Sequence, residues 1–131
     1  MKGGEDMTKD NDLPLAVVTG GGTGIGRAVG ELLAQSGYRV CAIGLDRDDD
    51  LPAAIRFVRA DVTDTEAAIA ALPEGPVAAL VNCAGLLRHQ AEWQVEGFEL
   101  VMKVNLTAGF TLAMVMFAGM RERLALAKAQ A

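Results

Sequence analysis

The sequence is short of several residue types, and each shortage argues against a class of protein. Its 131 residues include one tyrosine, one histidine and two cysteines. The cysteines, Cys41 and Cys83, match no CxxC or zinc spacing, so we predict two reduced thiols and no metal site. The longest apolar stretch, residues 106–120, falls short of the roughly 18–20 residues that a membrane-spanning helix needs. We therefore expect no membrane partner.

Positive charge is also scarce, with 12 Lys and Arg against 17 Asp and Glu, a net charge of −5. Such a balance offers no basic patch for a phosphate backbone, so nucleic acid is not an expected partner. Residues 1–13 are polar and lack the apolar core of a signal peptide, which predicts a disordered tail on a cytoplasmic protein. Residues 14–131 are expected to form the folded part, because hydrophobic residues make up 51% of the chain.

The remaining pattern alternates between strands and helices. Strands are predicted over residues 15–19, 39–45, 55–60 and 77–82. Helices are predicted from Ile25 to a stop at Gly37, from a Thr63/Glu66 capping box to about Leu72, and from Val95 almost to the end. This alternation is typical of an α/β fold, with a parallel sheet, right-handed crossovers and helices on both faces.

A glycine-rich turn joins the first strand to the first helix. Glycines allow a sharp turn and close approach to a pyrophosphate, and the helix N-terminus then receives the negative charge. A glycine run alone is weak evidence, but here it follows a strand and opens an amphipathic helix. A P-loop is poorly supported, because no Gly-Lys-Ser/Thr follows. We therefore predict dinucleotide binding through Thr19, Gly20, Gly22, Thr23, Gly24, Ile25 and Gly26.

The motifs together resemble those of the short-chain dehydrogenase/reductase family. Thr19-Gly20-x-x-x-Gly24-Ile25-Gly26 matches the family's TGxxxGxG signature, and Asn82-Cys83-Ala84-Gly85 resembles its NNAG motif. Asp61-Val62 stands where the family places an aspartate that hydrogen-bonds the adenine, and Asn105 where it has a structural and catalytic asparagine. The resemblance implies a Rossmann-like sheet of strand order 3-2-1-4 and a nicotinamide cofactor, NAD or NADP. It adds Asp61, Val62, Asn82, Ala84 and Gly85 to the cofactor-binding residues, and Asn105 to the catalytic ones.

Each of these motifs also has a purely structural interpretation. Asp61 could be a loop residue before the Thr63 cap, and residues 82–85 could be only a tight turn. Asn105 falls on a predicted core-facing stripe, where an unpaired amide would cost about 1–3 kcal/mol. A hydrogen-bonded core asparagine is the alternative to the family's role, in which the residue bends the helix and orders a water.

The preference between NAD and NADP depends on the end of the second strand. The position where NAD-preferring relatives carry an acid falls on Gly44, with Asp46 two residues later and Arg47 after it. An acid binds the ribose 2′-hydroxyl, whereas an arginine meets a 2′-phosphate. We expect NAD, bound through Asp46.

The family's serine, tyrosine and lysine have no counterparts in these residues. The only serine is Ser36, and the only tyrosine is Tyr38, with Ala42 four residues later. We therefore expect a C-terminally truncated chain that alone transfers no hydride. Its uncovered fourth strand and apolar last helix predict self-association or a homo-oligomer.

Three functions follow from these expectations. The leading one is an NAD(P)-dependent oxidoreductase that interconverts an alcohol and a ketone once the fold is completed. The alternatives are a non-catalytic dinucleotide-binding module and an interaction subunit that docks on a full-length relative.

Overall fold

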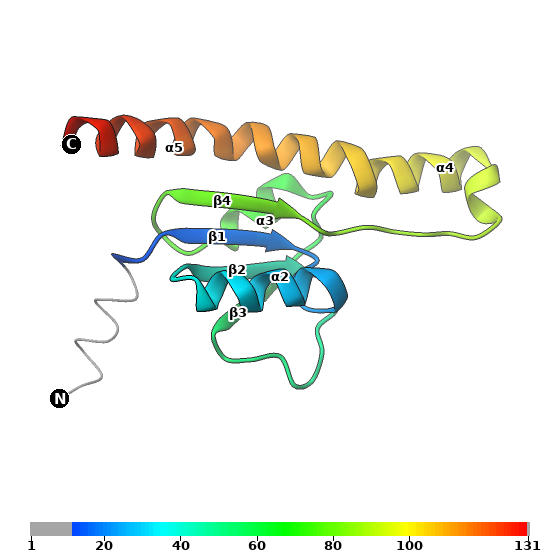
Figure 1. The fold of residues 1–131 in the computed structure, drawn as a ribbon. Coiled ribbons are helices and arrows are strands. Elements are labelled where there is room, and N and C mark those ends of the chain that lie inside the picture. Colours follow the sequence, from blue (N-terminus) through cyan, green and yellow to red (C-terminus); the bar gives the residue numbers. More distant parts are fainter. Residues whose placement is uncertain (1–11, 131) are drawn as a thin grey trace.

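The computed structural model describes residues 12–130 and shows a parallel sheet between helices (Figure 1). The strands are β1 (Leu15–Thr19), β2 (Arg39–Gly44), β3 (Ile55–Arg59) and β4 (Val77–Asn82). The helical elements are α2 (Gly24–Gln35), α3 (Thr65–Ala70), the 3-10 turn η1 (Ala91–Trp93), α4 (Val95–Met102), the π-helical segment η2 (Lys103–Thr107) and α5 (Ala108–Gln130).

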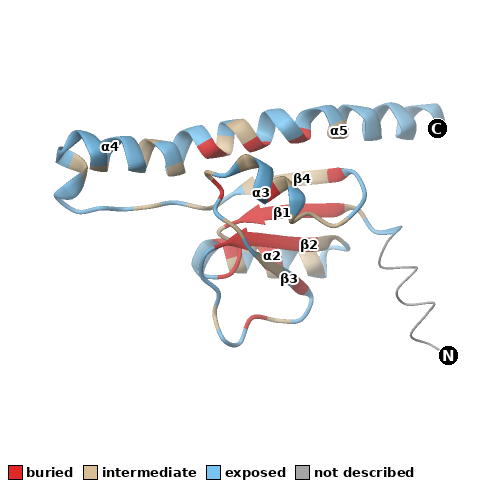
Figure 2. Cartoon of the chain, turned by 180° about the vertical axis from the view of Figure 1, so that it is seen from behind, coloured by how far each residue is buried: buried red, intermediate tan, exposed pale blue. Residues whose placement is uncertain are grey.

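The sheet has the predicted order, β3-β2-β1-β4 in the part of the chain that the structure describes. Every neighbouring pair is parallel, and β1 pairs with both β2 and β4. Every residue of β1 is buried, as is usual for a parallel strand covered on both faces (Figure 2). The Rossmann-like α/β fold expected from the sequence is therefore confirmed.

Two hydrophobic clusters attach helices to the opposite faces of this sheet. One face packs against α2, through Val29 and Leu33 of the helix. The other packs against α3 and α5. On that second face the helices contribute Ala68, Ala108, Leu112 and Met116, all of them buried. Because helices cover both faces of the sheet, a ligand can reach the strands only at their ends.

The last three helical elements join into one long helix, Val95–Gln130, that extends past the sheet at both ends (Figure 1). By length and composition it would be able to cross a membrane, since an 18-residue part of it has a mean hydropathy of 1.6. A core helix of a soluble protein passes the same test, and here Leu112 and Met116 pack on the sheet. Its outer side stays exposed. β4 forms an edge of the sheet, as expected.

Local details differ from the sequence expectations. α3 begins one residue after Asp64, whose carboxylate accepts the Ala67 N–H at 3.1 Å, so Asp64 is the cap and the Thr63 capping box is wrong. Asp64 caps the helix in place of Thr63 because its carboxylate oxygen reaches a free N–H of the first turn. The tail predicted over residues 1–13 lies outside the described residues, apart from residues 12 and 13.

Both cysteines are free, as expected. Cys41 is buried in β2, and burial raises the pKa of its thiol above the ordinary value. Cys83 is half-buried after β4. A thiol with a raised pKa is a poor nucleophile, so Cys41 acts as a small core residue.

Candidate functional site

A cavity of about 490 Å³ lies at the carboxyl ends of the strands. Four loops meet there, each following one strand. In doubly wound sheets this edge is where ligands bind, because the strands and helices leave a crevice at the point where the strand order reverses. Ten of the predicted cofactor residues line it: Gly20, Thr23, Gly24, Ile25, Gly26, Asp46, Asp61, Val62, Ala84 and Gly85.

The glycine turn is shaped by close contact between backbone segments. Gly20 has φ +66°, a left-handed conformation, and a Cβ there would lie 2.8 Å from the Ala84 nitrogen. A Cβ on Gly26 would lie 2.1 Å from the Gly20 carbonyl oxygen. Side chains at either position would force the turn away from the helix or from the loop after β4. Glycine is therefore required here by space as well as by conformation.

The N-terminus of α2 is left without a side-chain cap. Thr23 occupies the cap position in an extended conformation, but its hydroxyl makes no capping hydrogen bond, and the first turn holds no acidic residue. In α3, by contrast, Asp64 caps the helix and Glu66 stands in the first turn. The free N–H groups of α2 and the positive end of its dipole therefore face the cavity, which suits an anion.

An acidic loop after β2 forms one wall of the cavity through Asp46. The following residue, Arg47, does not line the cavity; its guanidinium lies 5.6 Å from the centre of the Phe57 ring. Further along, Asp48 and Asp50 bind Arg27 of α2 at 2.9 and 2.6 Å. Hydrogen bonds from Arg27 lower the pKa of Asp50, which favours the ionised form that the ion pair needs.

Asp61, after β3, faces the cavity but also holds its own loop together. Its Oδ1 accepts the Thr63 N–H at 2.9 Å and the Thr63 hydroxyl at 2.8 Å. These two hydrogen bonds lower the pKa of Asp61, with a further contribution from the charge of Lys103. The carboxylate is exposed and ionised, and one oxygen takes both bonds. Its second oxygen is available to a ligand in the cavity.

Three predicted residues lie behind the cavity wall. Thr19 is buried, and its hydroxyl accepts the backbone N–H groups of Cys83 and Ala84 at 3.2 Å each, which ties β1 to the loop after β4. Gly22 is buried against the backbone of Asp46. Asn82 turns toward α5, where its amide donates to the Gly109 carbonyl at 3.4 Å. None of the three lines the cavity, but each contacts a neighbouring segment of the site.

Asn105 makes a paired contact that the sequence did not show. Its Oδ1 accepts the Leu86 N–H at 2.6 Å, and its Nδ2 donates to the Leu86 carbonyl at 2.9 Å. The side chain is exposed and not buried as the predicted core-facing stripe implied, although it lines a small pocket together with Leu112 and Thr19. Asn105 lies within the π-helical segment η2, which helical periodicity did not predict. Asn105 thereby fastens the loop after β4 to the long helix.

Comparison with known proteins agrees with this geometry. Residues 14–125 match the family model described as short chain dehydrogenase. The chain belongs to this family. Its residues are 33% identical to an acetoacetyl-CoA reductase of Paracoccus denitrificans, over 83% of this chain and 50% of that protein. They are 39% identical to the 3-oxoacyl-[acyl-carrier-protein] reductase MabA of Mycobacterium bovis, over 74% and 41%.

Solved structures of the family superimpose on the same part of the chain. A short chain dehydrogenase/reductase family protein matches with a TM-score of 0.71 and 31% identity, covering 84% of this chain and 51% of that one. The serine dehydrogenase of Escherichia coli matches with a TM-score of 0.68 and 27% identity, covering 83% and 56%. The chain thus spans about half the length of the curated relatives it matches.

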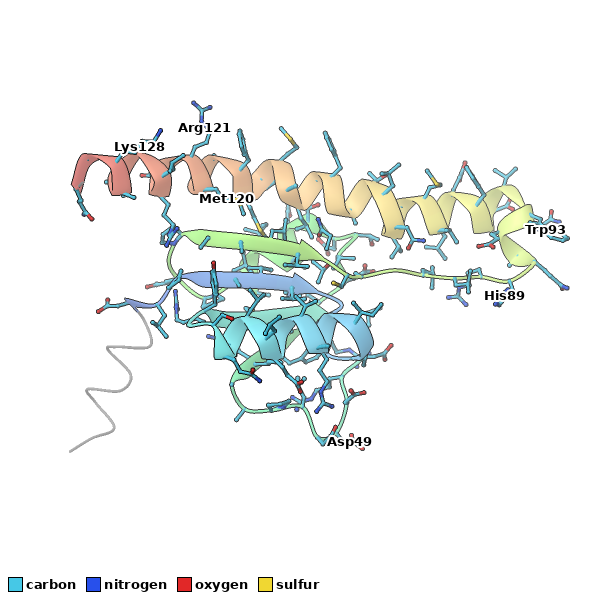
Figure 3. All side chains as sticks on the ribbon, in the orientation of Figure 1. Asp49, His89, Trp93, Met120, Arg121 and Lys128 are labelled. Atoms are coloured by element: carbon cyan, nitrogen blue, oxygen red, sulfur yellow. The ribbon has the colours of Figure 1, made fainter. Side chains whose placement is uncertain are left out.

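Neither the tyrosine nor the serine of this chain lines the cavity. Tyr38 and Ser36 lie between α2 and β2, at the end of β2 opposite to the cavity, and neither lines it. His89 is exposed and lies near α4, away from the sheet (Figure 3). Sequence reasoning missed five apolar residues that line the cavity: Leu45, Ala60, Leu86, Leu100 and Val104. Val104 belongs to the π-helical segment, which periodicity alone could not predict.

Proposed function

We propose that this chain forms the nicotinamide-dinucleotide-binding half of an oxidoreductase that interconverts an alcohol and a ketone. The observation that carries the proposal is the uncapped N-terminus of α2, which opens on a 490 Å³ cavity beside the packed glycine turn. Backbone N–H groups at such a site bind a pyrophosphate without any basic side chain. The names of the curated relatives, two of them reductases, support the reaction class.

The residues present fit a dinucleotide at several points. The backbone of Gly24, Ile25 and Gly26 would hold the pyrophosphate, Asp61 would accept from the adenine amino group, and Asp46 would accept from the ribose hydroxyls. When bound, the nicotinamide supplies the hydride-transfer chemistry. Asn105 holds the Leu86 peptide on both sides and so fixes the loop that closes the cavity.

Within the cofactor class we propose NAD rather than NADP. Asp46 lines the cavity, whereas Arg47 is stacked on Phe57 and Arg27 is paired with acids. A 2′-phosphate placed beside Asp46 would meet its negative charge, and the neighbouring Arg47 lies over Phe57 instead of lining the cavity. Like charges at this separation disfavour binding, and an acid at the ribose favours the 2′-hydroxyl.

Titration calorimetry of the 131-residue chain with NAD, NADH and NADP tests these statements. We expect NAD to bind more tightly than NADP, and Asp46→Asn to reduce that difference. At about 100 times its dissociation constant, NAD should stabilise the chain by roughly 2.7 kcal/mol in thermal unfolding. Absence of binding by all three nucleotides at millimolar concentration would overturn the proposal.

We further propose that the 131 residues alone carry out no hydride transfer. A phenol needs a nearby positive charge to act as a base at neutral pH, and the single tyrosine, Tyr38, lies at the wrong end of β2. The expected result is nucleotide binding without oxidation or reduction of any alcohol or ketone. Steady turnover by the chain alone would contradict this statement.

The outer side of α5 suits an interface with another protein subunit. Phe110, Met114 and Phe117 of α5 are each more than half exposed, as is Leu106 in the preceding η2, and such an apolar surface is unusual on a monomer. Figure 3 shows Met120 pointing toward the sheet, whereas Arg121 and Lys128 point away from it. We propose a homo-oligomer, in the cytoplasm, without nucleic-acid or membrane partners. Light scattering of the wild type and of Phe110→Lys tests it, with a monomeric wild type as the contrary result.

A further inference from the structure

Arg27 stands immediately after the last glycine of the turn, and all parts of its guanidinium are engaged. Nε donates to Glu31 on the same helix at 3.0 Å. Nη1 donates to Asp48 at 2.9 Å and to Asp50 at 2.6 Å, and Nη2 donates to the Asp50 carbonyl at 3.3 Å. The side chain therefore joins α2 to the loop between β2 and β3 through three separate acceptors.

The same loop is fixed to the glycine turn by its backbone. The Asp48 N–H donates to the Gly22 carbonyl at 2.9 Å. Gly22 is packed so closely that a Cβ there would lie 2.3 Å from the Asp46 carbonyl oxygen. Asp49, between the two acids that Arg27 holds, lies at the outer bend of the loop (Figure 3). The loop that holds Asp46 is thus joined to the glycine turn by the Asp48–Gly22 backbone hydrogen bond and to α2 by the side chain of Arg27.

We propose that Arg27 is a positioning residue for nucleotide recognition. By holding Asp48 and Asp50 it keeps Asp46, two residues earlier, at the wall of the cavity where it meets the adenosine ribose. This inference rests on the proposed function, because it needs a nucleotide in that cavity. Arginine suits the task because its planar fork serves two acceptors at fixed angles, which the single ammonium of lysine does not.

The charges around Arg27 make the tie depend on its guanidinium. Glu31, Asp48 and Asp50 are three acids facing one cation. Without Arg27 the three carboxylates repel one another, and the loop can separate from α2. Asp46 then samples positions away from the ribose. The nucleotide itself never needs to contact Arg27 for its affinity to fall.

A double-mutant cycle measured with ADP-ribose tests this inference. ADP-ribose carries the adenosine ribose and the pyrophosphate but no nicotinamide, so the readout is independent of turnover. The proteins are the wild-type chain, Arg27→Met, Asp46→Asn and the double variant. We expect Arg27→Met to weaken ADP-ribose binding by roughly fivefold or more in the wild type and by less than about twofold in the Asp46→Asn background. Arg27→Lys should recover part of the affinity.

Arg39→Met is the matched control. Arg39 also makes long-range hydrogen bonds, to the carbonyls of Leu13 and Glu74 at 3.1 Å each, but at the end of β2 opposite to the cavity. Its removal should lower the unfolding temperature without changing ADP-ribose affinity. If Arg27→Met does not fold, Asp48→Asn/Asp50→Asn removes the same ion pairs from the loop and should show the same coupling to Asp46.

The outcomes separate the two proposals. A wild-type chain that binds no ADP-ribose refutes the proposed function itself. A wild type that binds, with equal losses from Arg27→Met in both backgrounds, leaves nucleotide binding in place and overturns the positioning role. The positioning role is also overturned if the wild type binds ADP-ribose and Asp46→Asn leaves that affinity unchanged.

Discussion

Replacing Gly26 with alanine is expected to destabilise the whole nucleotide-binding turn. An added Cβ would lie 2.1 Å from the Gly20 carbonyl oxygen and 2.7 Å from its carbon, whereas ordinary van der Waals contact begins at 3.4 Å. Both neighbours are main-chain atoms, so they cannot rotate away as the tip of a side chain does. The substitution must therefore push α2 and the turn apart by about an ångström.

The size of the effect follows from two opposing contributions. Alanine in place of a helical glycine normally gains about 0.5–1 kcal/mol, because the unfolded chain loses less freedom on folding. Overpacking a tight site costs about 1–3 kcal/mol and occasionally more. Since backbone must move here, we expect a net loss of about 3 kcal/mol. At about 4 °C per kcal/mol for a domain of this size, the unfolding temperature falls by about 12 °C.

Thermal unfolding followed by circular dichroism measures the change, with Gly119→Ala as the matched control. Gly119 lies in α5, and a Cβ there meets no atom within 4 Å. The control should therefore raise the unfolding temperature slightly, by the ordinary helix preference. NAD affinity should fall only in Gly26→Ala. If both variants change stability by the same amount, the close packing of the turn is refuted.

Three further predictions concern the loops around the cavity. Asn105→Leu removes two exposed hydrogen bonds to the Leu86 backbone, where water can replace the lost partner, so we expect a loss of about 1 kcal/mol. We also expect faster hydrogen exchange at the Leu86 amide; unchanged exchange would contradict the paired contact. Asp64→Ala removes the cap of α3 and should cost about 1 kcal/mol in urea unfolding, while no loss would return the capping role to Thr63. Hydrogen bonds from Thr63 lower the pKa of Asp61, so its contribution to stability is present above the ordinary carboxyl pKa of about 4 and lost as pH falls through the lowered value. In Asp61→Asn, the free energy of unfolding should therefore depend less on pH below about pH 4 than in the wild type. An unchanged pH dependence in this range would contradict the prediction.

The fold could be predicted from the sequence because its signals are local and mutually consistent. The strands 15–19 and 77–82 appear as short apolar segments, and the structure has β1 and β4 at those bounds. The glycine turn is informative because it stands between a predicted strand and an amphipathic helix. Strand order came from the family resemblance, and the parallel pairings agree with it.

The parts that could not be predicted depend on contacts between distant residues. The π-helical segment changes the helical register by inserting a wider turn, and nothing in Lys103–Thr107 marks it by composition. The hydrogen bonds of Asn105 reach a backbone 19 residues away, which helical periodicity does not show. The ion pairs of Arg27 span 21 and 23 residues. The sequence alone therefore does not distinguish an arginine that holds a loop from an ordinary surface arginine.

The account depends on the backbone amides of the glycine turn binding the pyrophosphate of NAD. Titration of the isotopically labelled chain with NAD, followed by amide NMR shifts, measures this directly. We expect saturating shifts at Gly24, Ile25 and Gly26, and no shifts at the distant end of α5. Unmoved turn amides at millimolar NAD would contradict the central claim.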